Sequence, residues 1–186
     1  MGSGASVEEQ RGLINALSST DDLSYDAVLP LIQSFVRRQE LKATVQLCDL
    51  CDVERVEVLL GCGYDTSADM WSLGCIVFEL VTGELLFDPR AGKSWDREED
   101  HLAMMIELMG EFPPKLVQQG KSSAEYFTKR GDLRHIHQLK AWGLRDVLRD
   151  KYKLSTQDAD ELSALTTAAW LKVVSNWPKW ASIAMQ

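Results

Sequence analysis

The chain has 186 residues, of which 45% are hydrophobic and 26% charged. This is enough apolar material for one ordinary core, and the chain is too short for two full domains. The sequence contains neither an apolar run of about 18 residues nor a secretory leader pattern, so we expect a cytoplasmic or nuclear protein. The net charge of -8 argues against general nucleic-acid binding, which needs cations to displace counterions from phosphate.

The charge is unevenly distributed along the chain. Residues 79–111 carry nine acidic and three basic side chains, whereas residues 112–151 carry nine basic and four acidic ones. An acidic segment followed by a basic one suits a partner with charged peptide segments, although a solvated surface would have the same composition.

The first residues, M-G-S-G-A-S, fit the N-myristoylation pattern at Gly2, and they equally fit a flexible leader. Glu8 and Glu9 follow where basic residues would assist membrane binding, so we do not expect membrane association. Residues 7–18 and 24–40 read as two short amphipathic helices, and residues 43–48 as a short strand.

The cysteines are too few and too irregularly spaced for a disulfide framework or a zinc site. The one C-x-x-C pair has no second pair and no histidine near it. We therefore expect free thiols at the four positions, which are Cys48, Cys51, Cys62 and Cys75.

The clearest helix signal runs from Thr66 to Gly83 and is apolar on nearly all sides, which predicts a helix at the centre of a core with Trp71 and Phe78 inside. A second helix is predicted over residues 97–109. Its expected buried stripe is Leu102, Met105, Ile106 and Met109.

Residues 142–152 and 155–165 also read as helices, the second capped by Ser155. Residues 166–186 contain three tryptophans without a clean period, and no element is assigned to them. The predicted fold class is mainly α with little strand.

Residues 69–83 match the pattern D-x-W-S-x-G-C-I-x-x-E-L-x-T-G, which resembles the large central helix in the C-terminal lobe of a protein kinase. Residues 86–89, 97–110, 126–135 and 139–144 are similar to the serine/arginine-rich-protein kinases, which phosphorylate Arg-Ser repeats of splicing factors. The resemblance covers residues 56–161. It implies a kinase C-lobe-like domain there, with an unrecognised flank at residues 1–55 and a divergent Trp-rich tail at residues 162–186.

The resemblance assigns structural roles to three residues. Asp69 corresponds to the aspartate that braces the catalytic loop, and Trp71 belongs to the same motif. Glu57 stands where kinases keep the glutamate of Ala-Pro-Glu, and the arginine that pairs with it in the family would fall beyond the matched region.

The family also has an acidic docking groove for basic substrate segments, and its positions fall on Glu84, Asp100 and Glu107, with Lys151 facing them. Independently of the resemblance, Asp100 and Glu107 are seven residues apart, so two helical turns place them on one face. The alternative is a solvated acidic helix face without a ligand.

The residues that perform phosphoryl transfer are not found. Kinases need a Gly-rich loop, a strand lysine, a catalytic-loop aspartate and asparagine, and a metal-binding aspartate. The sequence has no H-R-D, G-x-G-x-x-G or V-A-I-K stretch. Asp49 resembles the start of the metal-binding Asp-Leu-Gly, but Cys51 replaces the glycine and Glu57 follows too soon for an activation segment.

We therefore expect no catalytic residue, no metal site and no cofactor in this chain, although intact family members use ATP and magnesium. The three histidines, which are His101, His135 and His137, are expected to be surface or capping residues. The first functional hypothesis is a truncated serine/threonine kinase for Arg-Ser-rich splicing proteins that keeps the docking region. The alternative is a non-catalytic module that binds basic peptides. A splice form, a shortened gene or an inaccurate gene prediction would each produce such a chain.

Overall fold

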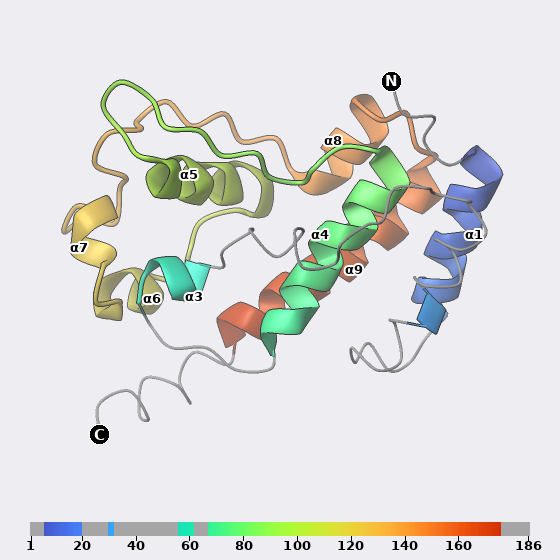
Figure 1. The fold of residues 1–186 in the computed structure, drawn as a ribbon, viewed down its shortest axis with the longest axis horizontal. Coiled ribbons are helices and arrows are strands. Elements are labelled where there is room, and N and C mark those ends of the chain that lie inside the picture. The colour runs from blue at the N-terminus through green and yellow to red at the C-terminus, as the bar shows by residue number, and fades with distance from the viewer. Residues whose placement is uncertain (1–5, 20–29, 32–55, 62–66, 176–186) are drawn as a thin grey trace. The chain divides into compact units, whose positions relative to one another are not determined.

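A computed structural model describes residues 6–19, 30–31, 56–61 and 67–175. Within these residues the structure is mainly helical, as predicted (Figure 1), and β structure is limited to a bridge between Phe127 and Leu133. The helices are α1 (Val7–Ser18), α3 (Val56–Leu59), α4 (Ser67–Thr82), α5 (Arg97–Met109), α6 (Pro114–Gln119), α7 (Ser123–Tyr126), α8 (Leu144–Asp150) and α9 (Thr156–Ser175).

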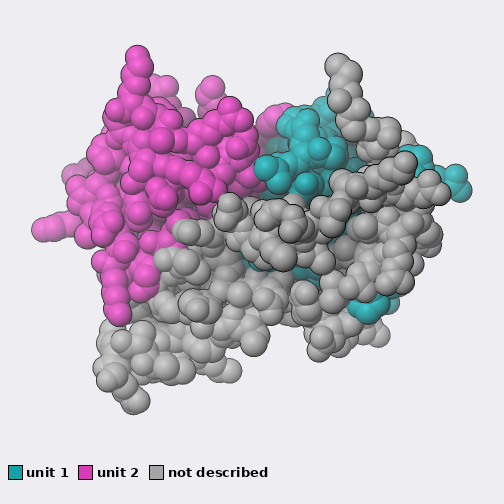
Figure 2. All heavy atoms as spheres, in the orientation of Figure 1, with its two compact units in different colours: residues 1–53, 69–86, 145–169 teal, residues 54–68, 87–144, 170–186 magenta. Residues whose placement is uncertain are grey.

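The chain divides into two compact units, which Figure 2 shows in different colours. Unit 1 consists of residues 1–53, 69–86 and 145–169, and unit 2 of residues 54–68, 87–144 and 170–186. Unit 1 thus holds α1, most of α4 and α8, and the first part of α9, whereas unit 2 holds α3, α5, α6, α7 and the end of α9.

Helix α4 lies in the core of unit 1, as its apolar sequence predicts. Trp71 is 1% exposed and Phe78 is 2% exposed. The helix ends at Thr82. The next residue, Gly83, has a φ of 75°, the left-handed conformation that glycine adopts without a steric penalty, and its N–H donates to the carbonyl of Glu79. The prediction that this helix is deeply buried is therefore confirmed.

Helix α1 has the predicted limits and is also part of unit 1. Ser6 and Glu9 form a capping box, in which the Glu9 carboxylate accepts the Ser6 backbone N–H at 2.8 Å. Its apolar side chains are buried at positions spaced three and four residues apart, Leu13, Ile14 and Leu17. This spacing is that of one helix face packed against the rest of a core.

In unit 2, helix α5 has the predicted limits and is capped by Asp96, whose side chain accepts the Glu99 N–H at 2.8 Å. Leu102 and Met105 of the predicted stripe are fully buried, whereas Ile106 and Met109 are only partly buried. The stripe is therefore narrower than predicted.

An aromatic cluster forms a second part of the core of unit 2. Phe112 packs edge-to-face on Phe127, with ring centroids 6.1 Å apart, and lies 5.6 Å from the ring of Trp170. Trp170 is 5% exposed, so this tryptophan of the unassigned tail region is a core residue.

The helix predicted over residues 142–152 is shorter in the structure, since α8 comprises only Leu144–Asp150. The N–H of Trp142 donates to the carbonyl of Glu107 at 3.0 Å, a tertiary bond that holds this residue outside the helix. At the other end, Lys153 adopts a left-handed φ of 58°, which breaks the helical path before α9.

Helix α9 begins as predicted, with the Ser155 hydroxyl accepting the Asp158 N–H at 3.1 Å, but it continues ten residues beyond the predicted end at residue 165. Thr166 is buried, and its hydroxyl donates to the carbonyl of Leu162 at 3.0 Å within the helix. This continuation was not predicted because the tryptophans of residues 166–186 follow no clean helical period.

Several predictions fall outside the described residues. These are the strand over residues 43–48, the start of a helix at Thr66, the leader at Gly2, and the thiols of Cys48, Cys51 and Cys62. Of the helix predicted over residues 24–40, only residues 30 and 31 are described, and both are helical. Cys75 is described and is a buried free thiol, and burial raises its pKa. No helix of the described residues is both long and apolar enough to cross a membrane.

Candidate functional site

Three residues were assigned to the kinase structural motif. Trp71 is buried in α4. Glu57 belongs to α3 and Asp69 to the first turn of α4, but the side chains of both lie outside the part of the chain that the structure describes, as does all of Asp49. Their roles therefore remain predictions.

Asp100, in the first turn of α5, is held by the loop that precedes the helix. Its Oδ2 atom accepts the backbone N–H of Arg90 at 2.8 Å, and the side chain is half-buried. A carboxylate has two oxygens and about four acceptor positions, so this one bond fixes its direction while leaving capacity for a cationic partner.

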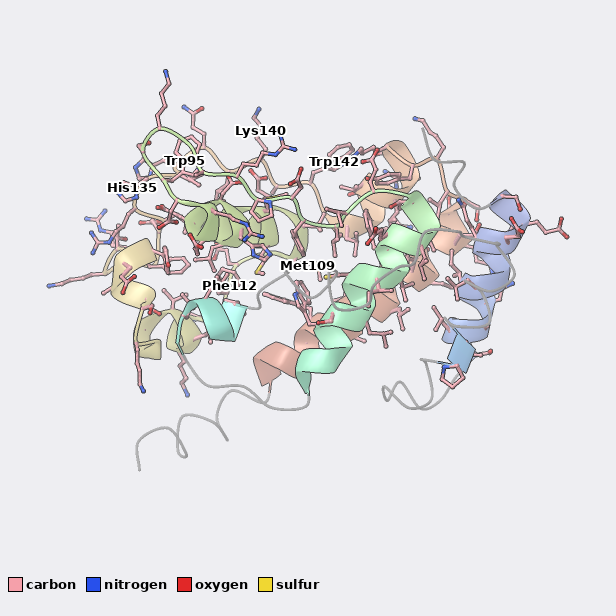
Figure 3. All side chains as sticks on the ribbon, in the orientation of Figure 1. Trp95, Met109, Phe112, His135, Lys140 and Trp142 are labelled. Atoms are coloured by element: carbon pink, nitrogen blue, oxygen red, sulfur yellow. The ribbon has the colours of Figure 1, made fainter. Side chains whose placement is uncertain are left out.

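Glu107, two turns further along α5, is held by the segment of residues 139–142. Its Oε1 atom accepts the backbone N–H of Lys140 at 2.7 Å, and its own carbonyl accepts the N–H of Trp142 at 3.0 Å. Lys140 and Trp142 lie along this segment in Figure 3. In the same segment, Leu139 is 37% exposed and Trp142 is 45% exposed.

Glu99 occupies the position before Asp100, but its carboxylate is buried and serves the fold. It accepts the backbone N–H of His135 at 2.7 Å and contacts the Nδ1 atom of the same residue at 2.6 Å. The side chain of Glu99 is 2% exposed and that of His135 is 48% exposed. Helix α5 thus carries one buried acid, Glu99, and two partly exposed acids, Asp100 and Glu107.

His101 was expected on the surface or at a cap, and this prediction is wrong. The residue is 3% exposed, and its ring lies 5.2 Å from that of Phe87. Burial, assisted by the nearby charge of Arg97, lowers the pKa of His101 to about 4. No sequence pattern indicated this burial, because His101 is adjacent to acidic residues in an amphipathic helix.

In unit 1, Glu84 and Lys151 lie together although 67 residues separate them in the chain. The Lys151 Nζ atom donates to Glu84 Oε2 at 2.7 Å, and the Tyr152 hydroxyl donates to the same oxygen at 2.8 Å. Hydrogen bonds from Lys151 and then Tyr152 hold the pKa of Glu84 below its ordinary value, and the bond to Glu84 raises the pKa of Lys151. These bonds therefore favour the ionised form of Glu84.

The predicted site residues thus form two groups, each defined within its own unit. Glu84 and Lys151 form a direct ion pair in unit 1, and Asp100 and Glu107 are on one helix in unit 2. Sequence reasoning did not include Tyr152 or the backbone donors of Arg90 and Lys140. Tyr152 follows Lys151 directly, but only the fold shows that both reach the same carboxylate.

Within the described ranges, no three His, Cys, Asp or Glu side chains converge as possible metal ligands. These residues therefore do not provide a donor set for the magnesium that kinases use with ATP, and no step of phosphoryl transfer is derived from them. What the described carboxylates can do is accept hydrogen bonds from cationic groups.

Comparison with known proteins identifies the family. The protein kinase domain family matches residues 56–152. Protein kinase dsk1 of Schizosaccharomyces pombe is 50% identical over 107 residues, which are 58% of this chain and 20% of that protein. SRSF protein kinase 3 of Homo sapiens is 49% identical over 109 residues, 59% of this chain and 19% of that protein.

Serine/threonine-protein kinase SRPK of Physarum polycephalum is 50% identical over 109 residues, 58% of this chain and 26% of that protein. The chain therefore spans about a fifth to a quarter of the length of these relatives. The matched residues include α4, α5 and α8 and all four predicted docking positions. The chain belongs to the protein kinase family and corresponds to part of a serine/threonine kinase of the SR protein kinase type.

Proposed function

We propose that this chain binds basic, Arg-rich protein segments through the carboxylates of Glu84, Asp100 and Glu107, with Lys151 beside Glu84. The relatives include kinases named for SRSF proteins, and we extend that partner class, Arg-Ser-rich splicing factors, to this chain. The chain would then take part in the regulation of splicing in the cytoplasm or nucleus.

The observation that carries the proposal is the way in which Asp100 and Glu107 are presented. Each is tied by a backbone N–H of a neighbouring segment, from Arg90 and Lys140 respectively, and neither is fully buried. Carboxylates fixed in this manner lose less conformational entropy on binding than freely rotating side chains. A guanidinium has five N–H donors in a planar fork, which suits a carboxylate whose orientation is set.

Phosphorylation of the bound segment is the second part of the family's function, and we do not assign it to this chain alone. The sequence of this chain lacks the Gly-rich loop, strand lysine and catalytic-loop motif on which transfer depends. The role that we propose for this chain is therefore that of a binding module for basic segments. ATP and magnesium would be needed only by a protein that supplies the missing motifs.

The test is the affinity for a fluorescent Arg-Ser repeat peptide, measured by anisotropy at low and moderate salt. The variant should combine Asp100→Asn with Glu107→Gln, because the side-chain amide oxygens still accept the Arg90 and Lys140 N–H groups while the charges are removed. We expect a loss of about tenfold or more, or ~1.4 kcal/mol.

The matched control is Glu111→Gln with Glu125→Gln, which removes the same charge from two exposed positions that are not predicted to contact the peptide. The control should retain most of the affinity, since it changes only long-range attraction that salt screens. If the two double variants bind the peptide equally well, Asp100 and Glu107 are a solvated helix face and the proposal is wrong.

A further inference from the structure

The side chains of Glu84, Lys151 and Tyr152 form a polar cluster in unit 1, and Tyr152 has no role in the docking site described so far. The Tyr152 hydroxyl donates to Glu84 Oε2 at 2.8 Å and accepts from the Lys151 Nζ atom at 2.9 Å. Lys151 also donates directly to Glu84 at 2.7 Å, so the three polar groups close a triangle.

The aromatic ring of Tyr152 anchors this cluster to the core. It packs edge-to-face on Phe78 of α4, with centroids 5.4 Å apart and planes at 88°. Phe78 is 2% exposed, so one wall of the tyrosine site belongs to the rigid centre of unit 1. The Lys151 Nζ atom lies 4.7 Å from the ring centroid, within the range of a cation–π contact.

An ion pair between Glu84 and Lys151 alone would not hold its geometry. Both side chains are about half exposed, at 57% and 47%, and exposed pairs of long side chains gain little after the entropic cost of fixing them. A tyrosine has only two main side-chain torsions, and here its ring is packed. Tyr152 therefore supplies the rigidity that the ion pair lacks.

The direction of the two bonds to Glu84 is also informative. Lys151 and Tyr152 both donate to Oε2, and the bonds among the described residues leave Oε1 for another donor. A carboxylate held through one oxygen presents the other in a defined direction, which favours a planar guanidinium over a group that can rotate freely.

We propose that Tyr152 is a positioning residue for peptide docking, whose hydroxyl fixes the Glu84 carboxylate and the Lys151 ammonium so that Glu84 Oε1 receives an arginine of the basic segment. This inference rests on the proposed docking function. It adds the residue that orients the Glu84 part of the docking site.

The test compares Tyr152→Phe with the unchanged full chain. Phenylalanine keeps the ring against Phe78 and removes only the hydroxyl, and Tyr126→Phe in unit 2 is the matched control for the chemical change. Affinity for the Arg-Ser peptide should fall about three- to tenfold in Tyr152→Phe, the effect of one hydrogen bond, and should not change in the control. In a Glu84→Ala background, Tyr152→Phe should cause no further loss.

A second measurement needs no peptide. Carbon-detected NMR titration of the Glu84 carboxyl should show a higher pKa in Tyr152→Phe than in the unchanged chain, because one of the two bonds that stabilise the ionised form is gone. An unchanged Glu84 titration would overturn the inference even if docking occurs.

The peptide results separate the two proposals. If Glu84→Ala weakens binding and Tyr152→Phe does not, docking at Glu84 stands and the role of Tyr152 is refuted. If Glu84→Ala itself has no effect, docking at Glu84 fails, and the inference fails with it. An equal loss from Tyr152→Phe with and without Glu84 would show that the tyrosine acts elsewhere.

Discussion

His135 binds the buried carboxylate of Glu99 through two different groups, its backbone N–H at 2.7 Å and its ring Nδ1 atom at 2.6 Å. These bonds join residues 36 positions apart and attach the segment after the Phe127–Leu133 bridge to helix α5. Because one of the bonds comes from the backbone, it does not depend on the histidine side chain.

This arrangement predicts unequal effects of substitution at the two positions. Glu99→Ala removes the acceptor of both bonds and should lower the free energy of unfolding by about 2–3 kcal/mol, whereas His135→Ala removes one bond and should cost about 1 kcal/mol. Urea denaturation followed by tryptophan fluorescence measures both. Losses of similar size would mean that the backbone bond contributes nothing.

Helix α1 is joined to α9 by Arg11, whose guanidinium donates to both oxygens of Asp158, at 3.3 and 3.1 Å. Burial raises the pKa of Asp158, but hydrogen bonds from Arg11 and Ser155 outweigh this effect and the net shift is downward. The associated stability is therefore present above the ordinary carboxyl pKa and is lost as the pH falls through the lower value of the folded state.

We expect Asp158→Ala to destabilise the chain by about 1–2 kcal/mol, because it also removes a hydrogen-bond partner of Ser155 at the start of α9. Arg11→Met should have a smaller effect, since this side chain is 53% exposed. In the double variant the two losses should not add. Strict additivity in thermal unfolding would show that the ion pair does not couple α1 to α9.

The buried imidazole of His101 predicts a pH dependence of stability. Its pKa is about 4 in the folded chain against 6.5 for the ordinary side chain, so the unfolded chain takes up a proton first as the pH falls. The stabilisation is complete above pH 6.5 and decreases towards pH 4. The loss at the lower pH should reach about 2–3 kcal/mol.

His101→Phe should remove this component of the acid sensitivity, and at neutral pH it should be tolerated because the Nε2 atom has no hydrogen-bond partner among the described residues. His137→Gln is the control, as His137 is exposed. Unfolding free energies from pH 7 to 4.5 test the prediction. A curve for His101→Phe parallel to that of the unchanged chain would contradict it.

Nucleotide binding should be weak or undetectable, because the sequence supplies neither a phosphate-cradling loop nor a reliable pair of magnesium ligands. Calorimetry with ATP and magnesium measures this directly, and incubation with labelled ATP and an Arg-Ser peptide should give no phosphate transfer. A micromolar dissociation constant would contradict the prediction. Loss of that binding in Asp49→Asn would then identify Asp49 as a ligand.

The sequence alone determined the family and the principal helices. The nearly all-round apolar character of residues 70–81 predicted the buried α4, and the periodicity and flanking Gly110 indicated the limits of α5, because both signals are local and strong. The resemblance to the kinase family placed the acidic docking positions at Glu84, Asp100 and Glu107, with Lys151 facing them, and helical spacing independently put Asp100 and Glu107 on one face.

Only the tertiary structure decided which of the neighbouring acids is buried, where α8 begins and ends, and that Tyr152 joins Lys151 at Glu84. Glu99 and Asp100 are adjacent and chemically similar, yet Glu99 is buried and bonded to the partly exposed His135, whereas Asp100 accepts a bond from the loop at Arg90. Such differences depend on contacts between residues 10 to 68 positions apart. Local propensity and periodicity contain no information about partners at that separation.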